Sequence, residues 1–78
     1  MQLNVKLIGR LTDYGRGNDD ITLPDEVTIN DVLSELGIVH KEVGPVSLND
    51  ALVSRSRWSA TTLQEGDHLT LMPPLAGG

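Results

Sequence analysis

The chain contains no cysteine and no phenylalanine, and its aromatic residues are a single tryptophan and a single tyrosine. The absence of cysteine excludes a disulfide, a thiolate metal site and a cysteine nucleophile, and it fits a reducing intracellular compartment. No apolar run approaches the length of a membrane span, and the amino terminus lacks a secretory pattern. We therefore expect a cytoplasmic domain that does not enter a membrane.

Basic residues are also scarce, because six lysines and arginines stand against eleven aspartates and glutamates, for a net charge of −5. This charge argues against general nucleic-acid binding and favours a partner with a basic docking face. Two histidines leave little material for a metal cluster or a catalytic triad. At 78 residues the chain is one small domain, which cannot enclose both a full core and a deep active-site cleft. We expect neither a bound metal nor a bound cofactor.

The two ends of the domain carry the alternating pattern of half-buried strands. Residues 2–8 alternate between apolar and polar side chains, and residues 68–72 do so again. Residues 9–19 are rich in glycine, arginine, aspartate and asparagine and are typical of a loop, and residues 20–23 are a candidate second strand.

One helix and one hairpin are predicted between these strands. Thr28 is typical of a helix N-cap with Asp31 as its acidic partner, and Gly37 stands where a glycine commonly ends a helix. The apolar residues between them recur at i, i+3, i+4 and i+7, which is one helical face. Residues 46–48 and 51–53 predict a short hairpin closed by a two-residue turn.

This order of elements is an α+β pattern, in which one main helix packs across one face of a mixed sheet. If the first and last strands are central neighbours, they run parallel and the helix lies in the crossover. We therefore expect a single β-grasp, ubiquitin-like domain over residues 1–72. The expected core residues are Leu3, Val5, Leu7, Ile29, Val32, Leu33, Leu36, Leu48, Leu63, Leu69 and Leu71.

The last six residues are the most informative feature of the sequence. Pro73 and Pro74 lack a backbone N–H and cannot continue a strand ladder, so they are expected to project residues 73–78 as a stiff extended arm. Gly77 and Gly78 have no side chains and can pass through a channel that admits only backbone. A frayed terminus is the alternative. We expect a presented end with a sterically open carboxylate.

Three segments together resemble the ubiquitin-like sulfur carriers over essentially the whole chain. They are residues 28–33, the turn at residues 63–67, and the stretch 71–78 with its double proline and terminal Gly-Gly. The closing Pro-Pro-Leu-Ala-Gly-Gly is most similar to the small subunit of molybdopterin synthase. The segment Arg55-Ser-Arg57-Trp58 is instead closer to the thiamine-pathway carriers, and the phenylalanines common in the molybdopterin subunits are absent.

The resemblance implies a carrier that is not itself catalytic but is a subunit of the synthase. An adenylating enzyme similar to ubiquitin-activating enzymes would use ATP to activate the Gly78 carboxylate, and a sulfur donor protein would then leave a thiocarboxylate. The large subunit of molybdopterin synthase, or a thiazole synthase in the thiamine alternative, would accept the sulfur. Met72 and Leu75 flank the prolines and are expected to be exposed contacts for a partner. The implied channel-threading residues are Gly77, Ala76, Leu75, Pro74 and Pro73.

Other functions remain open from the sequence. The chain could be a ubiquitin-like modifier that is joined through Gly78 to lysines of other proteins, or an interaction module with an inert tail. Arg55, Arg57 and Trp58 could stack on a nucleic-acid base. Because the chain is acidic overall, we expect instead that Trp58 holds an irregular loop to the domain. His68 falls on the outward phase of the last strand and is expected to be an ordinary exposed histidine.

Overall fold

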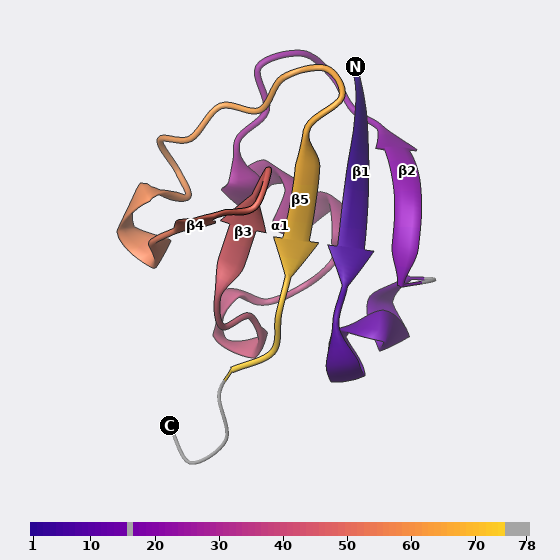
Figure 1. Cartoon of the computed structure of the whole chain (residues 1–78), viewed down its shortest axis with the longest axis vertical. Helices are drawn as coiled ribbons and strands as arrows, with labels where there is room; N and C mark the ends of the chain where they lie inside the picture. Colours follow the sequence, from indigo (N-terminus) through magenta and orange to yellow (C-terminus); the bar gives the residue numbers. More distant parts are fainter. Residues whose placement is uncertain (16, 75–78) are drawn as a thin grey trace.

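The computed structural model describes residues 1–15 and 17–74 of the chain (Figure 1). Strands, one α-helix and three short 3₁₀ segments alternate along it. The elements are β1 (Gln2–Leu7), η1 (Gly9–Tyr14), β2 (Asn18–Thr22), α1 (Ile29–Leu36), η2 (His40–Glu42), β3 (Val46–Leu48), β4 (Ala51–Val53), η3 (Arg55–Arg57) and β5 (His68–Leu71).

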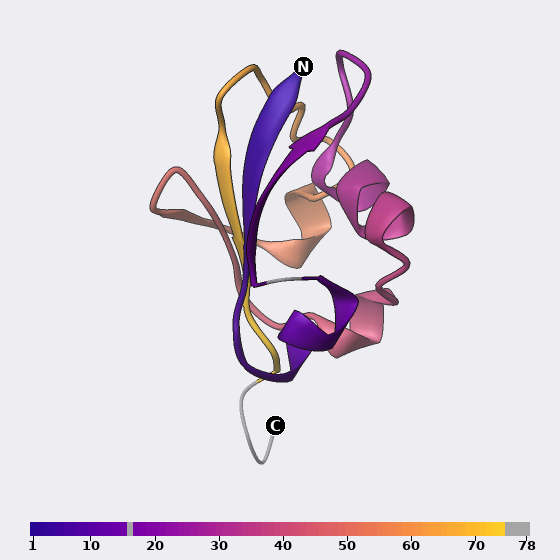
Figure 2. The same cartoon turned by 90° about the vertical axis from the view of Figure 1, so that its right-hand side faces the viewer.

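The strands form one five-stranded mixed sheet in the order β2-β1-β5-β3-β4. The first and last strands, β1 and β5, lie side by side at its centre and are parallel, with Val5 opposite Leu69. All other neighbours are antiparallel. Figure 2 shows α1 and the three 3₁₀ segments on one side of the sheet. The predicted β-grasp arrangement is therefore confirmed.

Helix α1 begins and ends as its sequence predicts. The Thr28 hydroxyl accepts a hydrogen bond from the Asp31 N–H (3.3 Å), and the Asp31 carboxylate accepts one from the Thr28 N–H (2.8 Å), which is a complete capping box. Gly37 closes the helix with φ +74°, a left-handed conformation that glycine adopts without steric cost. No described helix has the length and apolar character needed to cross a bilayer.

The core lies between the sheet and the helical side. All expected core residues are buried except Leu36 and Leu48, which are half-buried against the core. Six further residues complete the buried cluster, and the sequence patterns did not single them out as core. They are Leu11, Leu23, Ile38, Val43, Val46 and Trp58.

Two predicted segments need correction. The expected loop at residues 9–19 contains the 3₁₀ segment η1, within which Leu11 is fully buried in the core cluster. The second strand covers Asn18–Thr22 rather than residues 20–23, since its bounds follow from pairing with β1 and not from its own alternation. The last strand ends at Leu71, one residue earlier than expected.

Candidate functional site

The root of the carboxy-terminal arm is the part of the predicted site that the structure describes. Of the arm residues, Pro73 is half-buried and Pro74 is exposed. The predicted site residues Leu75, Ala76, Gly77 and Gly78 lie outside the described residues. Met72, predicted to be an exposed partner contact, is half-buried, because it still pairs through its backbone with the loop before β3.

Backbone hydrogen bonds hold the chain up to Met72. The Ile8 N–H donates to the Leu71 carbonyl (3.0 Å) on one side. On the other side Met72 donates to the Pro45 carbonyl (3.1 Å) and accepts from the Gly44 N–H (2.8 Å). A proline follows at once and has no N–H to extend this ladder. The sheet therefore releases the arm at a fixed position.

Two glycines flank the first proline of the arm. A Cβ atom at Gly44 would lie 2.6 Å from the Pro73 carbonyl oxygen and 2.7 Å from the Pro74 Cα. A Cβ at Gly9 would lie 3.2 Å from the Pro73 Cγ, and Gly9 also has φ +60°. Neither glycine was predicted to belong to the site. The sequence offers only the Gly44-Pro45 turn signal, which says nothing about contact with a distant segment.

The Arg55–Trp58 cluster supports the loop that carries Gly44. Trp58 is 1% exposed and donates from Nε1 to the Val53 carbonyl (3.0 Å). The Arg55 guanidinium lies 4.6 Å from the centre of the indole ring and donates to the carbonyls of His40 (3.0 Å) and Val43 (2.6 Å). Trp58 thus holds an irregular loop to the domain, as predicted, and its buried ring is not free to stack on a base.

A continuous set of contacts joins this cluster to the arm. Arg55 fixes the carbonyl of Val43, and the next residue, Gly44, bonds to Met72 and touches Pro73. The planar guanidinium of an arginine can donate hydrogen bonds to two carbonyls in a fixed geometry. The single ammonium group of a lysine does not offer this geometry. We expect the cluster to influence where the arm leaves the sheet.

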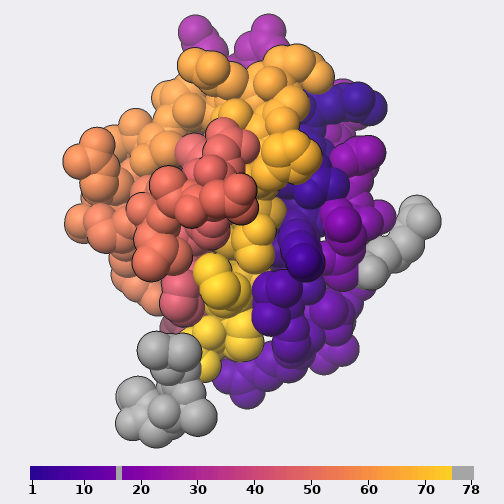
Figure 3. Space-filling model, viewed as in Figure 1, coloured from indigo at the N-terminus to yellow at the C-terminus, as the bar shows by residue number. Residues whose placement is uncertain are grey.

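The outer face of the sheet carries polar side chains at the end of β5 opposite the arm root. Figure 3 shows this face, with β5 between the β3–β4 hairpin and β1. His68 is exposed there, as predicted, and its Nδ1 lies 3.4 Å from the Asn4 Oδ1. Leu52 on the hairpin is 76% exposed.

Among residues 1–15 and 17–74, no group of three or more histidines or acids is placed to hold a metal.

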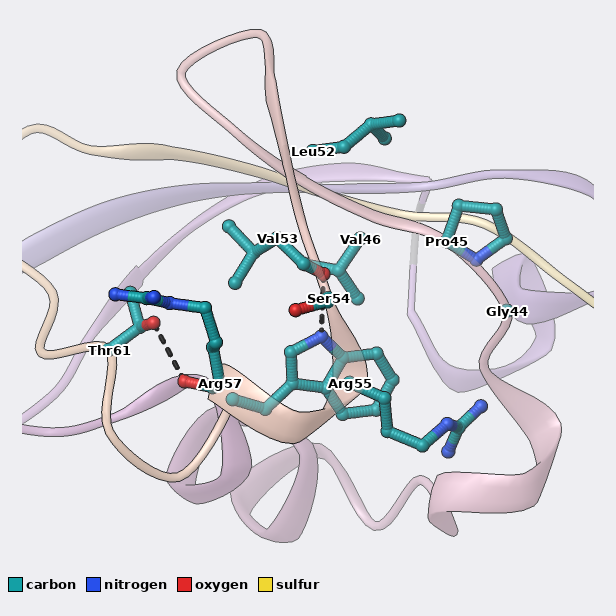
Figure 4. A pocket seen from close by; sticks show the side chains of 10 residues that line it. Gly44, Pro45, Val46, Leu52, Val53, Ser54, Arg55, Arg57 and Thr61 are labelled. Carbon is teal, nitrogen blue, oxygen red and sulfur yellow. Dashed lines mark hydrogen bonds between the residues drawn. The ribbon is translucent and has the colours of Figure 1, made fainter.

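An open groove of about 650 Å³ lies beside β4 and η3. Figure 4 shows Arg57 at one end, Gly44 and Pro45 at the other, and Val46 and Val53 between them. The groove lacks the convergent acid and base groups that a hydrolytic site requires, so it does not resemble an active site. Its lining is formed by Gly44, Pro45, Val46, Leu52, Val53, Ser54, Arg55, Arg57, Trp58 and Thr61.

Comparison with known families and structures agrees with the fold. The model described as the ThiS family matches residues 5–78. No curated protein matches the chain in sequence.

Several solved structures share the fold. The Haloferax volcanii protein HVO 2177 has a TM-score of 0.82 and 26% identity, with 100% of this chain and 87% of that one covered. A chain of the complex of subunits 1 and 2 of molybdopterin-converting factor from Helicobacter pylori has a TM-score of 0.63 and 27% identity, with full coverage of both. A putative molybdopterin converting factor subunit 1 from Pyrococcus furiosus has a TM-score of 0.75 and 22% identity over 96% of this chain and 99% of that one.

Proposed function

The chain belongs to the ThiS family of ubiquitin-like proteins, and from this premise we propose that it is a sulfur carrier acting through the carboxylate of Gly78. The arm root carries this proposal. A β-grasp sheet that releases a double proline between two closely packed glycines is suited to presenting the end of its chain to a partner. In this proposal the reacting group is the Gly78 carboxylate, and a glycine has no side chain to shield it.

The proposed chemistry follows from the weakness of a carboxylate as an electrophile. A separate adenylating enzyme would let the Gly78 carboxylate attack the α-phosphate of ATP, with pyrophosphate as the leaving group. A persulfide of a donor protein would then displace AMP to give an acyl disulfide, and a second thiol of the partner proteins would attack the donor sulfur, leaving a thiocarboxylate on Gly78 and a disulfide on the partners. Sulfide would displace AMP and give the thiocarboxylate directly. This chain supplies the reacting end and a docking surface, and its partners supply the acid and base groups.

We further propose that the sulfur is used in molybdopterin formation. The terminal Pro-Pro-Leu-Ala-Gly-Gly supports this pathway, and so does the similarity to a chain from the Helicobacter pylori complex. In that case the carrier would form an isolable complex with the large subunit of molybdopterin synthase. The contact would use the arm together with the apolar residues Met72 and Leu75.

A thiamine-pathway carrier is the second candidate, supported by the Arg55–Trp58 segment and by the family model itself. Capture of sulfur acceptors by the thiocarboxylated chain separates the two. Recovery of a molybdopterin synthase large subunit supports the first pathway, and recovery of a thiazole-forming synthase alone overturns it. Isopeptide-linked remnants of Gly78 on cellular proteins would instead identify a protein modifier.

A further inference from the structure

The strand β4 forms a free edge of the sheet. The sheet order ends at β4, which pairs only with β3 among the described residues. In a two-residue hairpin the residues that flank the turn, Leu48 and Ala51, form a hydrogen-bonded pair, and the pairs alternate from there. Leu52 therefore directs its N–H and C=O away from β3. An extended segment of another chain could bond to them.

The groove runs along this edge and has an apolar floor. Val46 and Trp58 are almost wholly buried beneath it, and Val53 is half-buried. Figure 4 shows Leu52 on the strand above the groove, with its side chain turned away from Val53. A segment added to β4 would place alternate side chains over this floor.

The groove is basic in a chain that is acidic overall. Residues 51–63 contain two arginines and no aspartate or glutamate, whereas the whole chain has a net charge of −5. The Arg55 guanidinium is already bonded to two carbonyls. Arg57 is exposed and takes part in neither ion pair found among the described residues. Its charge is therefore available to a ligand.

We propose that this groove binds an extended acidic segment of a partner protein, which adds to β4 as a further strand. Its apolar side chains contact Val53, above the buried Val46 and Trp58, and a carboxylate pairs with Arg57. Backbone bonds to an open edge and pockets for alternate side chains are an established mode of peptide recognition. The proposed function assigns no ligand to this groove, so the inference goes beyond it.

The charge distribution favours this occupant over a second copy of the chain. Two copies that paired through β4 would each bring an unpaired Arg57 to the shared edge, where like charges repel. The far end of the groove is formed by Gly44, which also touches Pro73. A partner segment in the groove would thus lie next to the arm root.

Binding of designed peptides to the isotope-labelled chain tests the proposal, with backbone amide shifts as the measurement. The probe is a short synthetic peptide that alternates valine and glutamate. We expect saturable shifts at residues 44–46 and 52–61, and weaker binding as salt is raised. The same peptide with lysine in place of glutamate should not bind, and one with N-methylated backbone amides should bind far more weakly.

Matched variants test whether Arg57 and the backbone of Leu52 contact the peptide. Arg57→Glu should weaken the acidic peptide about tenfold or more, whereas Lys6→Glu, the same charge change on β1, should leave binding within about twofold. Leu52→Pro removes the edge N–H and should abolish binding. If Leu52→Pro lowers the temperature of the thermal transition, its loss of binding could reflect unfolding. The N-methylated peptide then tests the backbone hydrogen bonds at the edge on the unaltered, folded chain.

Three results would overturn the proposal. One is the absence of saturable shifts with peptide raised to about 1 mM. The second is equal binding of acidic and basic peptides, or equal loss in Arg57→Glu and Lys6→Glu. The third is a change of shift at the same amides when the concentration of the chain is raised without peptide. That result would show that a second copy of the chain occupies the groove. None of these results depends on whether Gly78 carries sulfur.

Discussion

Gly44 and Pro73 touch through their backbones: a Cβ atom at Gly44 would lie 2.6 Å from the Pro73 carbonyl oxygen. The two residues lie at the same end of two antiparallel neighbouring strands, since Gly44 precedes β3 and Pro73 follows β5. Their contact fixes the point at which the arm leaves the domain. Any side chain at position 44 must therefore displace the arm or the loop.

The first prediction concerns this contact. Gly44→Ala should lower the free energy of unfolding by about 1–3 kcal/mol through overpacking against backbone. It should also reduce adenylation of the chain by about tenfold or more, because small misplacements of a reacting group are costly. The measurement is pyrophosphate release with the cognate adenylating enzyme, beside a urea denaturation curve.

Gly37→Ala is the matched control. Gly37 has φ +74° but nothing within 4 Å of an added Cβ, so the substitution strains the backbone without touching the arm. It should cost about 1 kcal/mol of stability and leave adenylation of the folded chain unchanged. Equal losses of adenylation in the two variants would show that stability, and not arm position, explains the effect.

The second prediction concerns the Arg55–Trp58 cluster. Arg55→Lys keeps the charge but cannot donate in a fixed fork to the carbonyls of His40 and Val43. Because Arg55 is itself exposed, the expected loss of stability is small, about 1 kcal/mol. We expect a change of amide shift at Gly44 and Met72. Arg57→Lys should cause neither change, and identical spectra for the two variants would refute the coupling.

The third prediction tests the core beneath the sheet. Leu33 is fully buried on the inner face of α1, so Leu33→Ala should cost about 2–4 kcal/mol. Chemical denaturation measures this loss. Ser34→Ala, on the exposed face of the same helix, should stay within about 0.5 kcal/mol of the parent. A loss that small at Leu33 would be incompatible with the described packing.

The fourth prediction concerns the partner contact. Met72→Asp should strongly weaken the complex with the sulfur-accepting subunit, because it places an unpaired charge in a desolvated contact. Met72 is half-buried, so some loss of stability is expected as well. Leu52→Asp introduces the same charge at a highly exposed position on the hairpin and should leave the complex intact. Pull-down with the accepting subunit measures both, and equal weakening would refute this contact.

Local signals in the sequence predicted much of the fold. The caps Thr28 and Gly37 act on neighbouring backbone, and the pairing of β1 with β5 follows from their alternation and order. Leu11 escaped prediction because it is one apolar residue among polar ones, and it is buried only through packing into the core cluster. Burial of such a residue depends on distant parts of the chain.

The same distinction holds at the candidate site. The double proline and terminal glycines mark the arm in sequence, and the lone tryptophan marked a residue that holds a loop. Gly9 and Gly44 belong to the site because both approach Pro73, which is far from them along the chain. A sequence shows that a glycine is present and not which segment passes over it.

The intact mass of the chain recovered from cells with working sulfur metabolism tests the central claim most directly. We predict a species heavier by the difference between one sulfur and one oxygen atom, and fragmentation should assign that difference to the Gly78 carboxyl. A chain without Gly77 and Gly78 should lack this species and keep its thermal transition. An unmodified carboxylate in every preparation, with the adenylating enzyme and sulfur donor present, would contradict the account.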